Sequence, residues 1–103
     1  MAPETVSEYT HQYSIIYSQS MQDVLSGKFP PDANARKNII NAIFEVTKDP
    51  YPPNCKIETM QEKTKVYWYP VKGTNPQYWI SYLVMDSMII FLTPTWFVDF
   101  KLQ

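Results

Sequence analysis

The residues best suited by type to chemistry are four lysines between positions 56 and 72. Three consecutive aromatic residues lie among them, so that the order is Lys56, Lys63, Lys65, Tyr67, Trp68, Tyr69, Lys72. Lysines neutralise phosphates and aromatic rings stack on bases, so this pattern is typical of a surface that binds single-stranded RNA. The alternative is a solvated strand face, because Glu58 and Glu62 lie in the same stretch. The candidate RNA contacts are Lys63, Lys65, Lys72 and Tyr67.

A second possible chemistry is nucleophilic catalysis by Cys55 with His11 as base. No flanking motif supports this pair, and the alternative is that Cys55 is a small residue beside a loop. The sequence predicts neither a metal site nor a cofactor. Whether the chain is an enzyme stays open at this stage.

Large aromatic residues near the end of the sequence suggest contact with another protein. Aromatic side chains are enriched among the residues that contribute most of the binding energy of a protein interface. The alternative is that they fill the core. The candidate partner-binding residues are Trp79, Trp96, Phe97 and Phe100.

Composition predicts one folded domain. The chain has 103 residues, of which 45% are hydrophobic and 18% charged, enough apolar surface for a single core. We expect a loose tail over residues 1–11 and one domain over residues 12–103. The net charge of -1 excludes a strong overall field that would attract nucleic acid or an anionic membrane.

The sequence predicts a cytoplasmic protein with no membrane association. Its first residues are polar and acidic and lack the basic start and apolar run of a secretory signal. The longest apolar stretch, Met88–Leu92, is too short to cross a bilayer. Cys55 is the lone cysteine, so we expect a reduced thiol.

The first half of the chain predicts one strand and two helices. β-Branched and aromatic residues over Tyr13–Tyr17 favour a strand. Ser18 or Ser20 then caps a short helix that Gly27 ends. Asp32 caps a longer helix, with an apolar stripe at helical spacing, that ends before Asp49 and Pro50.

The second half predicts an antiparallel sheet, which makes the fold class α+β. Strands are expected over residues 65–71, 78–85 and 88–92, and Trp96–Phe100 is a candidate for one more. Asp86 and Ser87 form the two-residue loop of a hairpin. The predicted core consists of Ile39, Ile43, Phe44, Ile80, Tyr82, Val84, Ile90 and Phe91.

The order of these elements resembles the RelE/ParE toxin superfamily of bacterial toxin-antitoxin pairs. Three segments carry the resemblance, which spans roughly residues 9–93. They are the strand and helix start over residues 13–25, the helix and its stop over residues 36–52, and the hairpin formed by residues 78–86 with residues 89–91.

The resemblance implies the fold and a toxin-like function, but this chain departs from the pattern of the ribonucleases in that family. Trp79 stands where those enzymes usually carry an arginine, Trp68 and Pro70 where they carry lysines, and residues 93–96 where they carry a basic cluster. Cleavage needs such groups near the attacking hydroxyl and the phosphorane. Messenger-RNA cleavage is therefore a possibility that lacks its usual residues.

Two functions follow from the resemblance. The first is a toxin-like protein that acts through partners, with an antitoxin as its neutraliser and the ribosome or DNA gyrase as its target. The second is a non-catalytic interaction or dimerisation module on the same fold, which includes a homo-oligomer. Contact with nucleic acid stays the less supported alternative.

Overall fold

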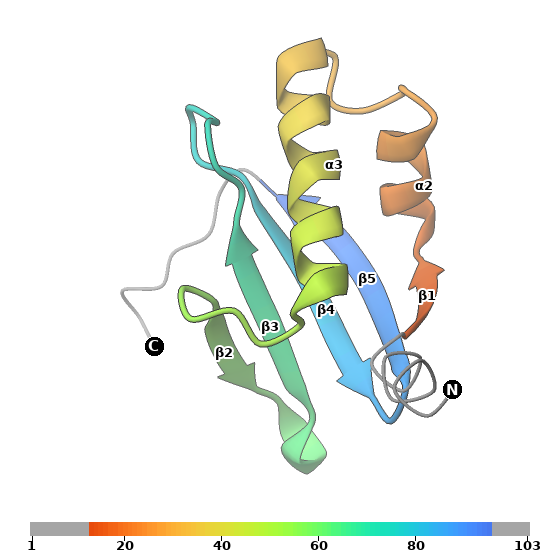
Figure 1. Ribbon diagram of the computed structural model, residues 1–103, viewed down its shortest axis with the longest axis vertical. Coiled ribbons are helices and arrows are strands. Elements are labelled where there is room, and N and C mark those ends of the chain that lie inside the picture. Colours follow the sequence, from red (N-terminus) through yellow and green to blue (C-terminus); the bar gives the residue numbers. More distant parts are fainter. Residues whose placement is uncertain (1–12, 96–103) are drawn as a thin grey trace, which may run out of the picture.

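The computed structural model describes residues 13–95 and shows an α+β architecture, with helices packed on one face of a five-stranded mixed sheet (Figure 1). The fold class expected from the sequence is confirmed. The elements in chain order are β1 (Ser14–Tyr17), α2 (Gln19–Leu25), α3 (Ala33–Lys48), β2 (Lys56–Thr59), the 3-10 turn η1 (Gln61–Lys63), β3 (Lys65–Pro70), β4 (Trp79–Met85) and β5 (Met88–Thr95). The tail predicted over residues 1–11 lies outside the described residues.

The strands lie in the order β1-β5-β4-β3-β2. Strands β2 to β5 form an antiparallel meander, whereas β1 pairs with β5 in parallel, with Ser14 in register with Met88. The two helices connect β1 at one edge of the sheet to β2 at the other (Figure 1). The sheet is therefore mixed, because the last described strand pairs in parallel with the first.

Both helices begin at the caps that the sequence predicts. The Ser18 hydroxyl accepts a hydrogen bond of 3.3 Å from the backbone N–H of Met21, and α2 ends before Gly27, whose φ of 85° suits glycine. The Asp32 carboxylate accepts a bond of 2.9 Å from the N–H of Asn34 at the start of α3. The caps satisfy backbone donors that a helix start leaves unpaired.

The core lies between the helices and one face of the sheet. Helix α3 buries Ala35, Ile39, Ala42, Ile43 and Val46, and α2 buries Met21 and Val24. The sheet contributes side chains that are fully or almost fully buried: Tyr69, Val71, Ile80, Tyr82, Ile89 and Phe91.

A row of aromatic rings crosses this inner face from strand to strand. Tyr17 and Phe91 lie with ring centroids 5.7 Å apart, as do Phe91 and Tyr82. Tyr82 stacks on Tyr67 at 5.5 Å, and Tyr67 meets the edge of Tyr51 at 5.5 Å. Such pairs stabilise a sheet beyond the area that they bury.

Three predictions for the core need correction. Phe44 is 57% exposed, because the buried stripe of α3 runs through the small residue Ala42 and leaves Phe44 facing away from the sheet. Ile90 is half-buried on the opposite face of the sheet, and its neighbour Ile89 is in the core. Val84 is only partly buried at the edge of the core. The other predicted core residues are buried.

The sheet also differs from the prediction in its strands. Strand β2 was not predicted, because its residues alternate charge with apolar or hydroxyl side chains over only four positions. Strand β5 continues through Pro94 to Thr95 instead of ending at Leu92. Pro94 fits there because β1 pairs with β5 only as far as Phe91, so proline breaks no bond to β1. The strand proposed over Trp96–Phe100 lies outside the described residues.

Candidate partner-binding face

Side chains on the strands that do not face the helices form a second, outer face of the sheet. Successive residues of a strand point to opposite faces, so the neighbours of the core residues Tyr69, Ile80 and Tyr82 point away from the helices. Among the described residues both helices lie on the inner side (Figure 1). The outer face therefore lies on the side of the sheet away from both helices.

Strand register brings six residues of the outer face into two adjacent rows. In one row Trp68 lies opposite Ser81, and Ser81 lies opposite Thr93. In the other row Pro70 lies opposite Trp79, and Trp79 lies opposite Thr95. We call these six residues the outer patch. None of them carries a charge.

Hydrogen bonds hold parts of the outer patch in place. The Ser81 hydroxyl, only 1% exposed, donates to the carbonyl of Thr93 over 3.2 Å. The indole N–H of Trp68 donates to the Glu58 carboxylate over 3.2 Å. A β-bulge lies between these rows and the rest of the hairpin, because Tyr82 pairs with Phe91 while Ser81 pairs with Thr93, which leaves Leu92 as the extra residue.

The outer patch contains residues from three separate parts of the sequence. Trp68, Pro70 and Trp79 all belong to it, as do Thr93 and Thr95. Positions that are far apart in the sequence therefore lie side by side. The outer patch presents two indoles, a proline and hydroxyl groups.

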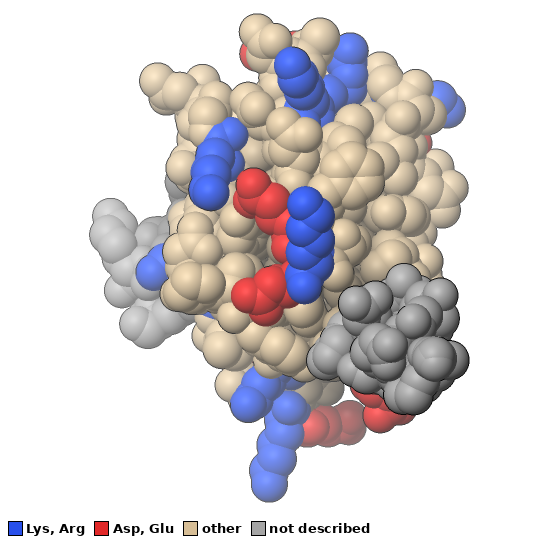
Figure 2. Space-filling model, in the orientation of Figure 1, with Lys and Arg blue, Asp and Glu red and all other residues tan. Residues whose placement is uncertain are grey.

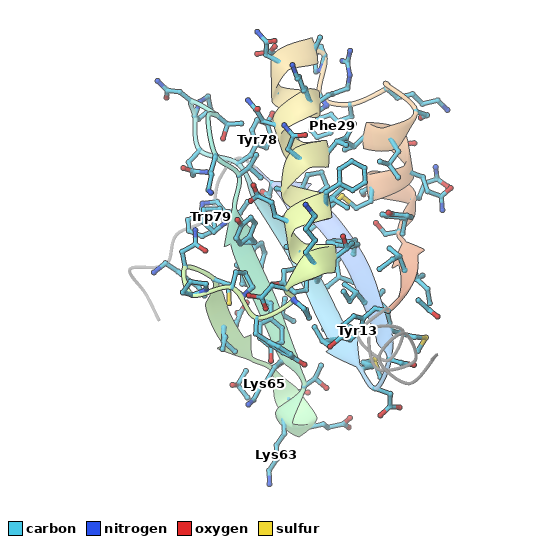
Figure 3. All side chains as sticks on the ribbon, in the orientation of Figure 1. Tyr13, Phe29, Lys63, Lys65, Tyr78 and Trp79 are labelled. Atoms are coloured by element: carbon cyan, nitrogen blue, oxygen red, sulfur yellow. The ribbon has the colours of Figure 1, made fainter. Side chains whose placement is uncertain are left out.

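Of the four candidate partner-binding residues, the structure describes Trp79. It is half-buried on the outer face at the start of β4 (Figure 3). The other three, Trp96, Phe97 and Phe100, lie outside the described residues. Trp68, which was not among the predicted partner-binding residues, lies on the same outer face in the adjacent row. The alternation of side chains along a strand is the signal that could have placed it there.

The candidate RNA contacts divide between the two ends of β3. Lys63 and Lys65 lie at one end of the molecule (Figure 3), where together with Tyr67 they line a hollow of about 280 Å³. Lys72 follows the other end of the strand. The ring of Tyr67 stacks on Tyr82 on the inner face, whereas single-stranded nucleic acid is held by exposed rings.

Charges on the side of the molecule that bears the helices do not form a continuous basic surface. Figure 2 shows Lys and Arg in separate places there, with Asp and Glu between some of them. Arg36 is held by the carbonyls of Pro30 and Pro31, the second over 3.1 Å. The described residues on the side of the molecule seen in Figure 2 therefore form no continuous row of cations that could bind a phosphate backbone.

Cys55 lies in an environment that does not activate a thiol. It is half-buried beside the core. Burial is the main reason why the pKa of its thiol is raised, and the carboxylate of Asp49 adds to that effect. A nucleophilic cysteine needs a lowered pKa. Its suggested partner, His11, lies outside the described residues.

A hollow of about 480 Å³ lies between the start of α3 and the loop from β3 to β4. Its lining includes Asp32, Asn34, Thr74, Asn75 and Tyr78. The amide of Asn38 donates to the carbonyl of Gly73 over 3.3 Å beside this loop. Within residues 13–95 no three His, Cys, Asp or Glu side chains lie close enough to hold a metal ion.

Comparisons with protein-family models, with curated proteins and with solved structures give no match for this chain. Among the described residues no helix is both long and apolar enough to cross a membrane.

Proposed function

We propose that this chain is a toxin-like protein that acts by binding other proteins through its outer patch. In this proposal an antitoxin-like polypeptide neutralises the chain, and the ribosome or DNA gyrase is its target. One observation carries the proposal. Strand register brings two tryptophans, a proline and three hydroxyl side chains together on one face, without a charge among them. The resemblance expected from the sequence implies cationic residues at several of these positions, so their replacement supports a protein ligand.

The chemistry of the outer patch favours protein over RNA as the ligand. Tryptophan is the side chain most enriched at the energetic centre of protein interfaces, and it loses little conformational freedom on binding. RNA needs cations along its backbone, which the six residues of the patch lack. Trp68 is also held by Glu58, so a polyanion would meet a carboxylate at the rim.

The second candidate is a non-catalytic interaction module on the same fold. The observation that favours it is that no side chain of the outer patch is charged or can act as a strong acid or base near neutral pH. Both candidates bind protein through the same face. They differ in whether binding harms the host cell.

Induced expression in bacteria separates the two candidates. A toxin-like protein arrests growth when it is expressed alone, and growth recovers when the gene beside it is expressed as well. The double variant Trp68→Ala, Trp79→Ala should abolish the arrest. An interaction module leaves growth unchanged but still forms a complex with the product of the neighbouring gene.

Phe44→Ala is the matched control, because Phe44 is a large exposed aromatic residue on the helix side. It should keep both arrest and complex formation. Equal binding by wild type and the double tryptophan variant, with both shown to be folded by circular dichroism, would contradict a role for the outer patch.

A further inference from the structure

Strand β2 forms an edge of the sheet that is open among the described residues. It pairs with β3 on one side and is the terminal strand in the sheet order (Figure 1). An open edge presents backbone N–H and C=O groups that another strand can pair with. Whether a second strand pairs with an edge strand depends on whether the side chains of the two strands attract or repel each other.

The hydrogen-bond phase of β2 shows which of its residues face the open side. The N–H of Met60 donates to the carbonyl of Thr64 over 2.7 Å and so extends the ladder between β2 and β3. In an antiparallel pair, residues alternate between those bonded to the neighbour and those that are not. Lys56 and Glu58 therefore bond toward β3, and the backbone of Ile57 and Thr59 points outward.

The side chains of β2 are complementary to a second copy of the same strand. An antiparallel copy centred on Ile57 places each Lys56 opposite the Glu58 of the other copy, on the outer face. These are the closely spaced, non-hydrogen-bonded positions of such a pair, where side chains interact most strongly. The indole of Trp68 already holds one oxygen of Glu58 at this edge.

The backbone agrees with this register. With Ile57 opposite Ile57 of the second copy, each residue donates its N–H to the carbonyl of the other. A register centred on Glu58 would put two carboxylates opposite each other. The backbone groups at its centre would be those of Glu58, which point toward β3 and away from the second copy. Like charges directly opposite destabilise a strand pair.

Exposed apolar side chains around β2 add a hydrophobic contribution. Ile57 is 53% exposed and lies on the inner face opposite Tyr67. Tyr51, also 53% exposed, packs against that same tyrosine. Pairing of two β2 strands would bring the Ile57 side chains of both copies together and shield them from water.

We infer that two copies of this chain associate through antiparallel pairing of their β2 strands and form one continuous sheet, held in register by Lys56 and Glu58. The second copy is the occupant that the alternation of charge on β2 specifies. This inference does not depend on the proposed function, because it rests on the backbone and charges of β2, and Trp68 enters it only as the hydrogen-bond donor to Glu58.

Charge reversal tests the inference by sedimentation velocity over a range of concentrations. The wild type should show a reversible dimer. Lys56→Glu and Glu58→Lys each turn two attractive pairs into two repulsive ones, so each should raise the dimer dissociation constant about tenfold or more. The double variant K56E/E58K should restore the dimer, because it swaps the charges and keeps them complementary.

The most specific test is to mix the two single variants, Lys56→Glu and Glu58→Lys. In the mixed pair, every Glu of one chain meets a Lys of the other, so a heterodimer should form although neither variant dimerises alone. Lys37→Glu on α3 is the matched control and should leave the dissociation constant unchanged. Circular dichroism checks that each variant is folded. A monomeric wild type, a dimer that the single reversals do not weaken, or a mixture that stays monomeric would overturn the inference.

Discussion

The phenolic O–H of Tyr82 donates a hydrogen bond of 2.8 Å to the carbonyl oxygen of Pro50 inside the core. Tyr82 lies at the centre of the sheet, and Pro50 is part of the loop that follows α3. Both residues are buried. The bond fixes the point at which the chain leaves the helix layer and turns toward the edge strand β2.

Replacing Tyr82 with phenylalanine should leave the Pro50 carbonyl without this partner. A buried polar group that loses its hydrogen bond costs about 1 to 3 kcal/mol, and we expect a loss of that size in the free energy of unfolding in urea. Tyr67→Phe is the matched control on the same face and should cost less than about 0.5 kcal/mol. Equal losses in the two variants would contradict a role for the bond.

Truncation should distinguish Ile89 from Phe44. Ile89 is fully buried, so Ile89→Ala should cost about 2 to 5 kcal/mol of unfolding free energy through lost burial and a residual cavity. Phe44 is 57% exposed, so Phe44→Ala should cost less than about 1 kcal/mol. Chemical denaturation of both variants measures the two values. A larger loss of unfolding free energy for Phe44→Ala would mean that this ring is covered in solution.

The cap of α3 should respond to the chemistry of residue 32. Asp32→Ala removes the acceptor for the N–H of Asn34 and should cost about 0.5 to 2 kcal/mol. Asp32→Asn keeps a side-chain oxygen and should cost much less. Thermal unfolding of the three proteins side by side tests this order, and an alanine variant as stable as wild type would contradict it.

Stability should fall with rising pH through the titration of Tyr69. Burial raises the pKa of Tyr69 to about 12, and the Glu45 carboxylate, which accepts a hydrogen bond from the Tyr69 hydroxyl, adds to this effect. An unfolded tyrosine ionises near pH 10. Because the folded pKa is the higher one, this contribution is complete below about pH 10 and is lost between about pH 10 and 12.

The variant Tyr69→Phe tests that pH dependence. Its free energy of unfolding should fall less steeply than that of wild type over the same interval. Tyr82, whose pKa is also raised, mainly by burial, is present in both proteins. Parallel curves for the two proteins would rule out Tyr69 as the source.

Purified protein should show little or no cleavage of messenger RNA on the ribosome. Trp79 stands in place of the expected arginine, and Trp68 and Pro70 in place of lysines, so the groups that would stabilise a phosphorane are missing from the outer patch. A translating extract with mapped RNA ends measures cleavage. Cutting at codons that disappears when Lys63, Lys65 and Lys72 are changed to alanine would overturn this prediction.

Local patterns in the sequence predicted the helices and the central hairpin well, because caps, prolines and alternation act over a few residues. Asp32, Gly27 and the loop at Asp86 all lie where those patterns place them. Ile90 was misassigned for a related reason. The run from Met88 to Leu92 is apolar at every position, so no alternation indicates which side chains face the core.

The outer patch could not be predicted from local patterns, because it depends on register between strands. Alternation along one strand indicates only which side chains of that strand share a face. Their juxtaposition follows from the pairing of Trp68 with Ser81 and of Pro70 with Trp79, and the extra residue Leu92 then shifts Thr93 into the same row. Register and bulges are set by contacts between distant segments.

The parallel pairing of β1 with β5 has a consequence for how the chain folds during synthesis. Ser14 finds its partner Met88 only after nearly all of the described chain has been made, and within residues 13–95 no other strand pairs with β1. Contacts between residues so distant in sequence slow folding, because the intervening loop must close first. On the ribosome the helices can form early, while β1 has to wait for β5, so the apolar residues Ile15 and Ile16 have no strand partner until β5 has been made.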